Sequence, residues 1–145
     1  MTAQADDPPP ELRAIAMATE RRAAIRTIAM PADTNPSGDI FGGWLMSQMD
    51  LAAGNLAARI ARGRCATVAV DAMTFHEPVK VGDEITVYAD LEKIGRTSIK
   101  MHVTVYRRAR ADEHRDLVTE ARFTFVALDD ARRPRPVRPG DTVET

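Results

Sequence analysis

One long helical pattern followed only by strand patterns constrains the fold of this chain more than any other feature. From Gly43 to about Arg62, apolar and small residues recur at helical spacing, and Gly63 can end the helix. After this segment the sequence alternates with a period of two instead. Because a single amphipathic helix must bury its apolar stripe against another element, we expect it to lie on the inner face of a sheet.

Alternation of apolar and polar residues predicts one strand before the helix and further strands after it. The expected strands cover residues 22–30, 64–75, 85–91, 99–105 and 117–127. Short turns between consecutive strands favour an antiparallel meander. The predicted fold class is therefore α+β, with the order β-α-β-β-β-β and one long central helix wrapped by a curved antiparallel sheet.

Length and the composition of the first residues indicate a single domain. A chain of 145 residues has room for one core of ordinary size. Residues 1–20 include an acidic pair and a run of prolines, so we expect a disordered or loosely docked leader there. The expected domain covers residues 21–128.

Residues 129–145 differ from the expected domain in composition. They are rich in proline and arginine and poor in apolar side chains, so we expect a solvated tail. The alternative is a functional tail in which Arg132, Arg133 and Arg135 approach a phosphorylated ligand.

Charge and cysteine usage exclude several classes of function. The 20 Lys and Arg residues nearly balance the 21 Asp and Glu residues, so no global positive field draws the protein to nucleic acid or to a membrane surface. The sequence has neither a secretion signal nor a membrane-spanning run of apolar residues, and the single cysteine, Cys65, excludes an internal disulfide. We therefore expect a cytoplasmic protein with no nucleic-acid and no membrane partner. His76, His102 and His114 are dispersed, so no metal site is expected.

Apolar residues on the outer side of the helix indicate association between subunits. Trp44, Leu51 and Ala58 lie away from the main apolar stripe. One helix and one sheet leave this side uncovered in so small a domain. We therefore expect a partner subunit there and a homo-oligomer.

Asp50 is a candidate catalytic residue because of its place on the helix. A count of about 100° per residue puts it beside Ala57 and Ala61, at the margin of the apolar stripe. A carboxylate with apolar neighbours is disfavoured as an anion and is suited to take a proton from water, so Asp50 is a candidate general base. The sequence leaves equally open that the Asp50 side chain points into solvent at the edge of the stripe.

Gly42 and Gly43 lead directly into the helix. Backbone N–H groups at a helix N-terminus stabilise a developing oxyanion, and glycines let a carbonyl group come close. The alternative is that the glycines only form a turn and that Asp39 caps the helix. Asp50 lies about two turns farther along, too far for both groups to act on one small electrophile within a single chain. A site shared between two subunits would resolve this distance.

Residues 26–50 closely resemble the YciA-type acyl-CoA thioesterases of the hotdog superfamily. This run ends in Met-Ser-Gln-Met-Asp50, and shorter matches follow at Met73-Thr-Phe, Pro78-Val, Val81-Gly-Asp, Gly95-Arg-Thr-Ser-Ile and Phe123-Thr-Phe-Val-Ala. The resemblance extends from about Arg26 to Val137. It implies a hotdog fold whose subunits pair, often as a trimer of dimers that forms a hexamer, with active sites at the dimer interface.

The resemblance also implies a hydrolase that converts acyl-CoA to a free acid and coenzyme A. No cofactor would be needed, because coenzyme A is part of the substrate. Asp50 would be the catalytic carboxylate, which activates water or attacks the thioester directly. The N–H groups near Gly42 and Gly43 of the opposing subunit would polarise the thioester carbonyl, and Asn35 would lie beside the site.

For the nucleotide of coenzyme A, the resemblance directs attention to basic and turn-forming residues. Arginine forms bidentate bonds to phosphate. The candidates for nucleotide contact are Arg64, Gly95, Arg96, Thr97 and Ser98. In one place the chain departs from the family, whose members tend to have an apolar residue and then Lys or Arg before Pro-Val. Here His76-Glu77 stands at this position, which puts CoA affinity or substrate preference in question.

Two other functions are compatible with such a fold. A hotdog hydratase or dehydratase usually has a catalytic histidine near the helix start, and no histidine lies between Arg26 and Asp50. A non-catalytic acyl-CoA-binding sensor would use the same cleft only to bind. An aspartate at a position unfavourable for charge is hard to explain for binding alone.

Overall fold

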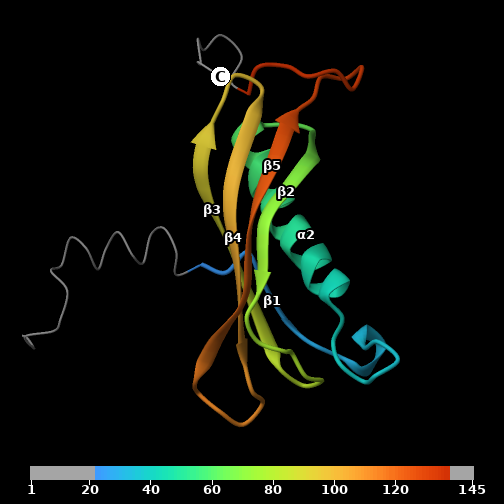
Figure 1. Ribbon diagram of the computed structural model, residues 1–145. Coiled ribbons are helices and arrows are strands. Elements are labelled where there is room, and N and C mark those ends of the chain that lie inside the picture. Colours follow the sequence, from blue (N-terminus) through green and yellow to red (C-terminus); the bar gives the residue numbers. More distant parts are fainter. Residues whose placement is uncertain (1–21, 138–145) are drawn as a thin grey trace, which may run out of the picture.

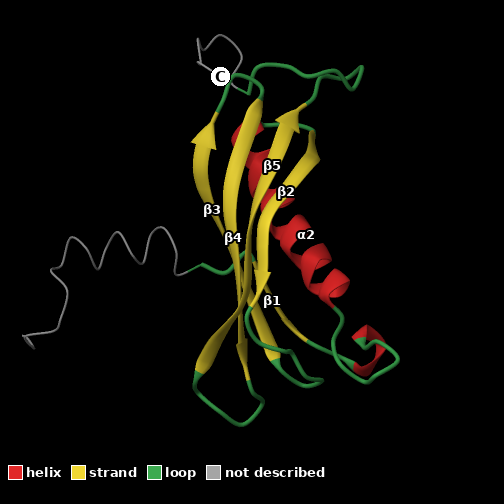
Figure 2. Cartoon of the chain, in the orientation of Figure 1, coloured by secondary structure: helices red, strands yellow, loops and turns green. Residues whose placement is uncertain are grey.

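A long helix packs against one face of a five-stranded antiparallel sheet in the computed structural model, which describes residues 22–137 (Figure 1). The elements in chain order are β1 (Ile25–Ile28), the short 3₁₀ helix η1 (Pro31–Asp33), α2 (Gly42–Ala61), β2 (Cys65–Phe75), β3 (Glu84–Ile94), β4 (Ser98–Arg108) and β5 (Arg115–Ala127). Figure 2 shows α2 lying along one face of the sheet. The predicted fold class and element order are confirmed. The leader expected at residues 1–20 lies outside the described residues.

The strands are arranged in the order β1-β3-β4-β5-β2, and only β3, β4 and β5 pair consecutively. β2 pairs with β5 and β1 pairs with β3. The expected meander is therefore wrong at the step from β2 to β3. The physical reason is the helix: α2 packs along the sheet and returns the chain to the edge beside β5, so that residues 76–83 must cross to the other side before β3 begins.

The core lies between α2 and the inner face of the sheet. The buried residues of α2 are Leu45, Met49, Ala52, Ala53, Ala57 and Ala61. The opposing sheet face contributes fully buried residues such as Val87, Met101 and Phe123. The small alanine side chains let the helix approach the sheet closely. They form most of the buried side of α2. Leu56 and Ile60, which the helical pattern places in the stripe, are only partly buried.

The ends of α2 lie within one residue of the expected positions. The helix begins at Gly42 and ends at Ala61, and Arg62 follows as a C-cap in the left-handed conformation, with φ 54°. The N–H groups of Arg62 and Gly63 both donate to the carbonyl of Ala58, which closes the last turn. None of the helices in the described part of the chain is long and apolar enough to span a membrane.

The outer side of α2 is apolar in part. Leu51 is 62% exposed, as expected for a residue on a surface that a second subunit would cover. Trp44, in contrast, packs partly against the core of its own subunit. Further exposed apolar side chains lie on the adjacent edge strand β2, where Val68 is 57% and Phe75 is 50% exposed. An apolar surface therefore extends from α2 onto the edge of the sheet.

Residues 129–137 pack onto the domain, which differs from the solvated tail expected for them. Val137 is buried in the core, and its N–H donates to the carbonyl of Arg96. The guanidinium of Arg135 donates to the carbonyl of Ala61 at the end of α2, at 2.8 Å. Composition could not reveal this packing, because it depends on contacts between residues that are far apart in sequence. The remainder of the expected tail lies outside the described residues.

Candidate functional site

The Asp50 side chain is half-buried and is held by a contact from the sheet. Thr67 on β2 donates a hydrogen bond from Oγ1 to Oδ1 of Asp50 at 2.6 Å. Of the two orientations that the sequence left open, the structure thus shows a carboxylate fixed against β2. Within residues 22–137 its other oxygen, Oδ2, has no hydrogen-bond partner, so it is available to a water molecule or a substrate.

Thr67 is a site residue that the sequence analysis missed. It pairs with Phe125 on β5, whose side chain is buried, so Thr67 points toward α2. A register shift in β2 between Thr67 and Ala69 turns the strand locally. No spacing rule could have identified this partner, because 17 residues and a change from helix to strand separate it from Asp50.

The first turn of α2 presents N–H groups that no side chain caps. Phe41 is the N-cap residue and makes no side-chain capping bond, and no acidic residue lies in the first turn. Capping by Asp39, the alternative that the sequence offered, is therefore wrong. The N–H groups of Gly42 and Gly43 lie at the positive end of the helix dipole and can donate hydrogen bonds to an anionic oxygen or to one that develops negative charge.

Two aromatic rings crowd the start of the helix and explain why glycines stand there. A Cβ atom on Gly42 would lie 3.1 Å from Cζ of Phe75, and one on Gly43 would lie 3.3 Å from the ring of Phe41. A cavity of about 310 Å³ adjoins Gly42, with Leu45 and Val79 among the apolar residues that line it. An apolar group could therefore lie directly beside the N–H groups.

Asn35 organises the loop that leads to the helix. Its Oδ1 accepts hydrogen bonds from the N–H groups of Ser37 at 2.9 Å and Asp39 at 3.1 Å. The backbone N–H of Asn35 donates to the carbonyl of Asp39 at 2.7 Å, and a bridge between Thr34 and Ile40 closes the loop. The amide oxygen of Asn35 is thus engaged in shaping the approach to Gly42.

The two proposed halves of the site do not meet within one protomer. Gly42 and Asp50 lie eight residues apart on the same uninterrupted helix. At a rise of about 1.5 Å per residue, this spacing corresponds to roughly 12 Å along the axis. One thioester group therefore cannot contact both within one protomer.

Three of the residues expected to contact the nucleotide form the turn between β3 and β4. The N–H of Gly95 donates to the carbonyl of Ser98 at 2.8 Å, and a Cβ on Gly95 would lie only 2.6 Å from Oγ of Ser98. The carbonyl of Thr97 accepts the N–H of Ala127. These residues therefore build the turn through their backbone.

The other two residues expected at the nucleotide are exposed arginines. Arg96 lies in the same turn and Arg64 directly precedes β2. Arg64 accepts a backbone hydrogen bond from Leu128 at the end of β5, which places it near the turn that follows β3. Arg64 and Arg96 thus lie at the end of the sheet where α2 ends, away from Gly42.

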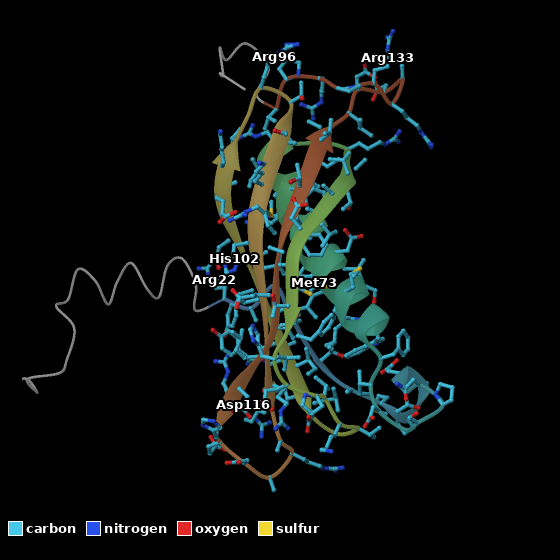
Figure 3. The ribbon with its side chains drawn as sticks, in the orientation of Figure 1. Arg22, Met73, Arg96, His102, Asp116 and Arg133 are labelled. Carbon is cyan, nitrogen blue, oxygen red and sulfur yellow. The ribbon has the colours of Figure 1, made fainter. Side chains whose placement is uncertain are left out.

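Glu120 joins two histidines on the outer face of the sheet, where Figure 3 labels His102. Its carboxylate contacts Nε2 of His102 and Nε2 of His76, each at 3.1 Å. These contacts, first with His102 and then with His76, lower the pKa of Glu120 from its usual value. The histidines are dispersed in the sequence, so no spacing pattern predicted this cluster. Among the described residues, no group of three or more His, Cys, Asp or Glu side chains is placed to hold a metal ion.

Cys65 is a half-buried free thiol at the start of β2. Burial raises the pKa of this thiol, and the positive charge of Arg135 opposes that shift only in part. The thiol is therefore protonated at neutral pH and poorly suited to act as a nucleophile.

Known proteins that are similar to this chain over most of its length are thioesterases. Residues 37–113 match the thioesterase superfamily. The acyl-CoA thioester hydrolase YciA of Salmonella typhimurium strain LT2 is 52% identical over 116 residues, which cover 78% of this chain and 87% of that protein.

Solved structures agree with this likeness. A hexameric thioesterase from Yersinia pestis superimposes with a TM-score of 0.78 at 50% identity, over 82% of this chain and 97% of that one. An aspartate-to-alanine mutant of a hexameric broad specificity acyl-coenzyme A thioesterase also gives a TM-score of 0.78, at 47% identity, over 83% of this chain and 88% of that one.

Proposed function

Because the chain belongs to the thioesterase superfamily, we propose that it hydrolyses acyl-CoA to a free carboxylic acid and coenzyme A. The single observation that carries this proposal is the Asp50 carboxylate, which Thr67 fixes through one oxygen while the other stays available to a reactant. Hydrolysis of a thioester needs a polarised carbonyl group and a deprotonated nucleophile. The N–H groups at the start of α2 can polarise the carbonyl group, and Asp50 can supply the deprotonated nucleophile, either itself or as the base for water.

In the proposed reaction, the N–H groups of Gly42 and Gly43 in one subunit hold the thioester oxygen while Asp50 of the partner subunit acts on the carbonyl carbon. As a general base, Asp50 removes a proton from water as the water oxygen bonds to that carbon. The C–S bond then breaks, and the leaving thiolate of coenzyme A takes the proton from Asp50. As a nucleophile, the Asp50 carboxylate would itself bond to the carbonyl carbon, and the C–S bond would break to release coenzyme A thiolate. Water would then hydrolyse the anhydride to the free acid and the Asp50 carboxylate, and the second proton of that water would go to the thiolate.

We propose that Asn35 acts indirectly in this site. Its Oδ1 holds the N–H groups of Ser37 and Asp39 and so fixes the path of the loop toward Gly42. Loss of these two bonds would let the first turn of α2 move relative to the thioester. Asn35 is in this view a positioning residue for the oxyanion-binding N–H groups.

We further propose a homodimer as the minimal unit and a trimer of dimers as the complete assembly. The structural relatives described above are hexamers, and the exposed apolar side chains of Leu51, Val68 and Phe75 offer a surface for a second chain. A cytoplasmic location suits the free thiol of Cys65, since reducing compartments keep cysteines unpaired. The reaction as written consumes only acyl-CoA and water and needs no cofactor.

The direct test is release of free thiol from short, medium and long acyl-CoA esters, with wild type, Asp50→Asn and Asp71→Asn assayed in parallel. Asp71 is a matched control, because it is an exposed carboxylate on β2 that pairs across the strands with Arg122. We expect hydrolysis of at least one ester by wild type and by Asp71→Asn, and loss of nearly all turnover in Asp50→Asn. Binding of acyl-CoA without thiol release would indicate a sensor instead, and hydration of an enoyl-CoA without thiol release would indicate a hydratase.

A further inference from the structure

The described residues cover the core incompletely along the second half of β3. Ala89 and Leu91 pair with Val103 and Met101 on β4, whose side chains are fully buried, so Ala89 and Leu91 face the core side of the sheet. Leu91 is nevertheless 45% exposed. An apolar side chain on the core side that stays in contact with water indicates that a further segment covers this place.

A groove of about 370 Å³ lies between this part of β3 and the helix. Its walls include Leu56 of α2, Ala89 of β3 and Ala23, which precedes β1. Two basic residues, Arg22 and Arg59, also line it. The described chain therefore begins at the groove itself.

β1 pairs with only the first part of the edge of β3. Its partners there are Glu84–Val87, and the N–H of Ala24 donates to the carbonyl of Val87 at 2.8 Å. Among residues 22–137, no strand pairs with this edge from residue 89 to residue 94. Because β1 runs antiparallel to β3, the chain that precedes Arg22 leads along this open edge, in the direction of Ile94.

The groove lies apart from the proposed active site. Ala52 and Arg59, which line the groove, lie two and nine residues after Asp50, which corresponds to roughly half a turn around α2. Asp50 contacts Thr67 on β2, and β1 and β2 form opposite edges of the sheet (Figure 1). An occupant of the groove would therefore leave the Asp50 side of the helix open.

Residues 11–21 directly precede the groove and carry apolar side chains suited to it. At about 100° per residue, a helix would place Leu12 and Ile15 on one face and Met17 on the opposite face. A helix of this length is marginal alone and needs packing against other residues to persist. The groove offers such packing.

The length of this segment matches the open part of β3. Ile15 lies eight residues before Ala23, or roughly 12 Å away along a helix. Leu91 and Ile94 lie about 7 and 16 Å beyond Ala89 along the strand. Because Ala23 and Ala89 line the same groove, a helix that follows the edge brings Ile15 to a level between Leu91 and Ile94.

Charge and tethering also favour this segment over a free partner. The groove is lined by Arg22 and Arg59, and residues 1–21 carry an excess of acidic side chains. Four are acidic (Asp6, Asp7, Glu11 and Glu20) and two are basic (Arg13 and Arg21). Because the segment is joined to the groove through Arg22, its effective concentration there is high.

We propose that residues 11–21 pack into the groove of their own chain as a short helix, with Ile15 against Leu91. Burial of these apolar side chains offsets the entropy that ordering the segment costs. The proposal concerns how the core is completed and does not depend on the reaction. Its tests use no thioester, so failure of the proposed function would leave it standing.

Cysteine cross-linking tests the position of the segment in the full chain. Ile15→Cys/Leu91→Cys and Ile15→Cys/Val81→Cys are made with Cys65→Ser and treated with a short bismaleimide, and the products are identified on denaturing gels and by peptide mass spectrometry. Val81 is a matched control, because it is also 45% exposed but precedes the opposite end of β3. We expect a link within one chain in the Leu91 pair and none in the Val81 pair.

Three results of cross-linking would overturn the proposal. The first is no link in the Leu91 pair, and the second is equal linking in both pairs, which would show a segment without a fixed place. The third is a link between chains, which would assign the groove to the segment of a neighbouring subunit.

Thermal unfolding at one fixed protein concentration tests the packing energy. Leu12→Ser/Ile15→Ser should lower Tm by roughly 5 °C, because two apolar side chains leave the groove. Met17→Ser is the control on the opposite face of the helix and should change Tm little. A Tm of the double variant equal to that of wild type would contradict the docking, and a change of oligomeric state in size-exclusion chromatography would show that the segment joins subunits instead.

Discussion

The hydroxyl of Thr67 donates a 2.6 Å hydrogen bond to Oδ1 of Asp50, and this bond joins the edge strand β2 to the long helix α2. Thr67 is therefore a positioning residue for the proposed catalytic carboxylate. A hydrogen bond to a charged group is stronger than a bond between neutral groups, so it holds the direction of the Asp50 carboxylate firmly.

Replacement of Thr67 by valine should lower kcat about tenfold and leave KM nearly unchanged, because the carboxylate loses its orientation while the binding surface stays intact. Thr67→Ser keeps the hydroxyl and should retain most of the turnover. Thr104→Val is a matched control, since Thr104 lies on β4 between the buried Val103 and Val105 and so faces the outer side. Equal kcat values for Thr67→Val and wild type would contradict the positioning role.

A side chain at Gly42 should damage catalysis without damaging the fold. A Cβ there would lie 3.1 Å from Cζ of Phe75, so Gly42→Val must displace the ring or the helix start, and we expect kcat to fall. Phe75 is half-exposed and can be removed, so Gly42→Val/Phe75→Ala should regain part of the turnover relative to Gly42→Val. Kinetics of both variants and of Phe75→Ala alone measure this, with circular dichroism as the check on folding. Full turnover in Gly42→Val would show that the helix start is not part of the site.

The elements of this fold could be predicted from the sequence because local patterns determine them. Helical spacing between Gly43 and Arg62 placed α2 within one residue of its ends, and period-two alternation located the strands. The pairing of β2 with β5 could not be predicted, because it depends on where the helix returns the chain. For the same reason, composition misjudged residues 129–137, whose order depends on distant partners of Arg135 and Val137.

The candidate site was predictable only in part. The position of Asp50 at the margin of the apolar stripe and the glycines at the helix start follow from a helical wheel. The contacts from Thr67 and Phe75 do not, because they come from a strand whose register shifts twice. The cluster of His76, His102 and Glu120 spans separations of 44 and 18 residues, and only the strand pairing brings it together.

Arg135 should contribute measurably to stability. Its guanidinium donates to the carbonyl of Ala61 at the end of α2 and to that of Leu128 at the end of β5. Arg135→Gln should lower the free energy of unfolding by about 2 kcal/mol, because two partly buried carbonyl groups lose a charged donor. Arg133→Gln, at a position whose side chain is 77% exposed, should have little effect. Chemical denaturation at one fixed protein concentration measures both, and equal stability of the two variants would contradict this account.

The contacts of Glu120 with His102 and His76 should give stability a dependence on acid pH. Because the pKa of Glu120 is lowered on folding, the carboxylate contributes stability above its ordinary value of 4.5, and this contribution is lost as pH falls through the lowered pKa. The side chain is 35% exposed, so solvent screens the effect and we expect it to be modest. The difference in Tm between wild type and Glu120→Gln should therefore shrink from about pH 6 to about pH 3. A difference that stays constant or grows on acidification would refute this assignment.

The central claim is that each active site combines Asp50 of one subunit with the helix start of its partner, and subunit mixing tests it most directly. Asp50→Asn and Gly42→Val chains, each inactive alone, are co-expressed with different tags, and the mixed oligomer is purified and assayed for thiol release. Each mixed dimer has one site with both defects and one site with none, so random mixing should restore about one quarter of wild-type turnover. If the mixed oligomer stays as inactive as its parents, the two groups do not act across the subunit interface and the shared site is wrong.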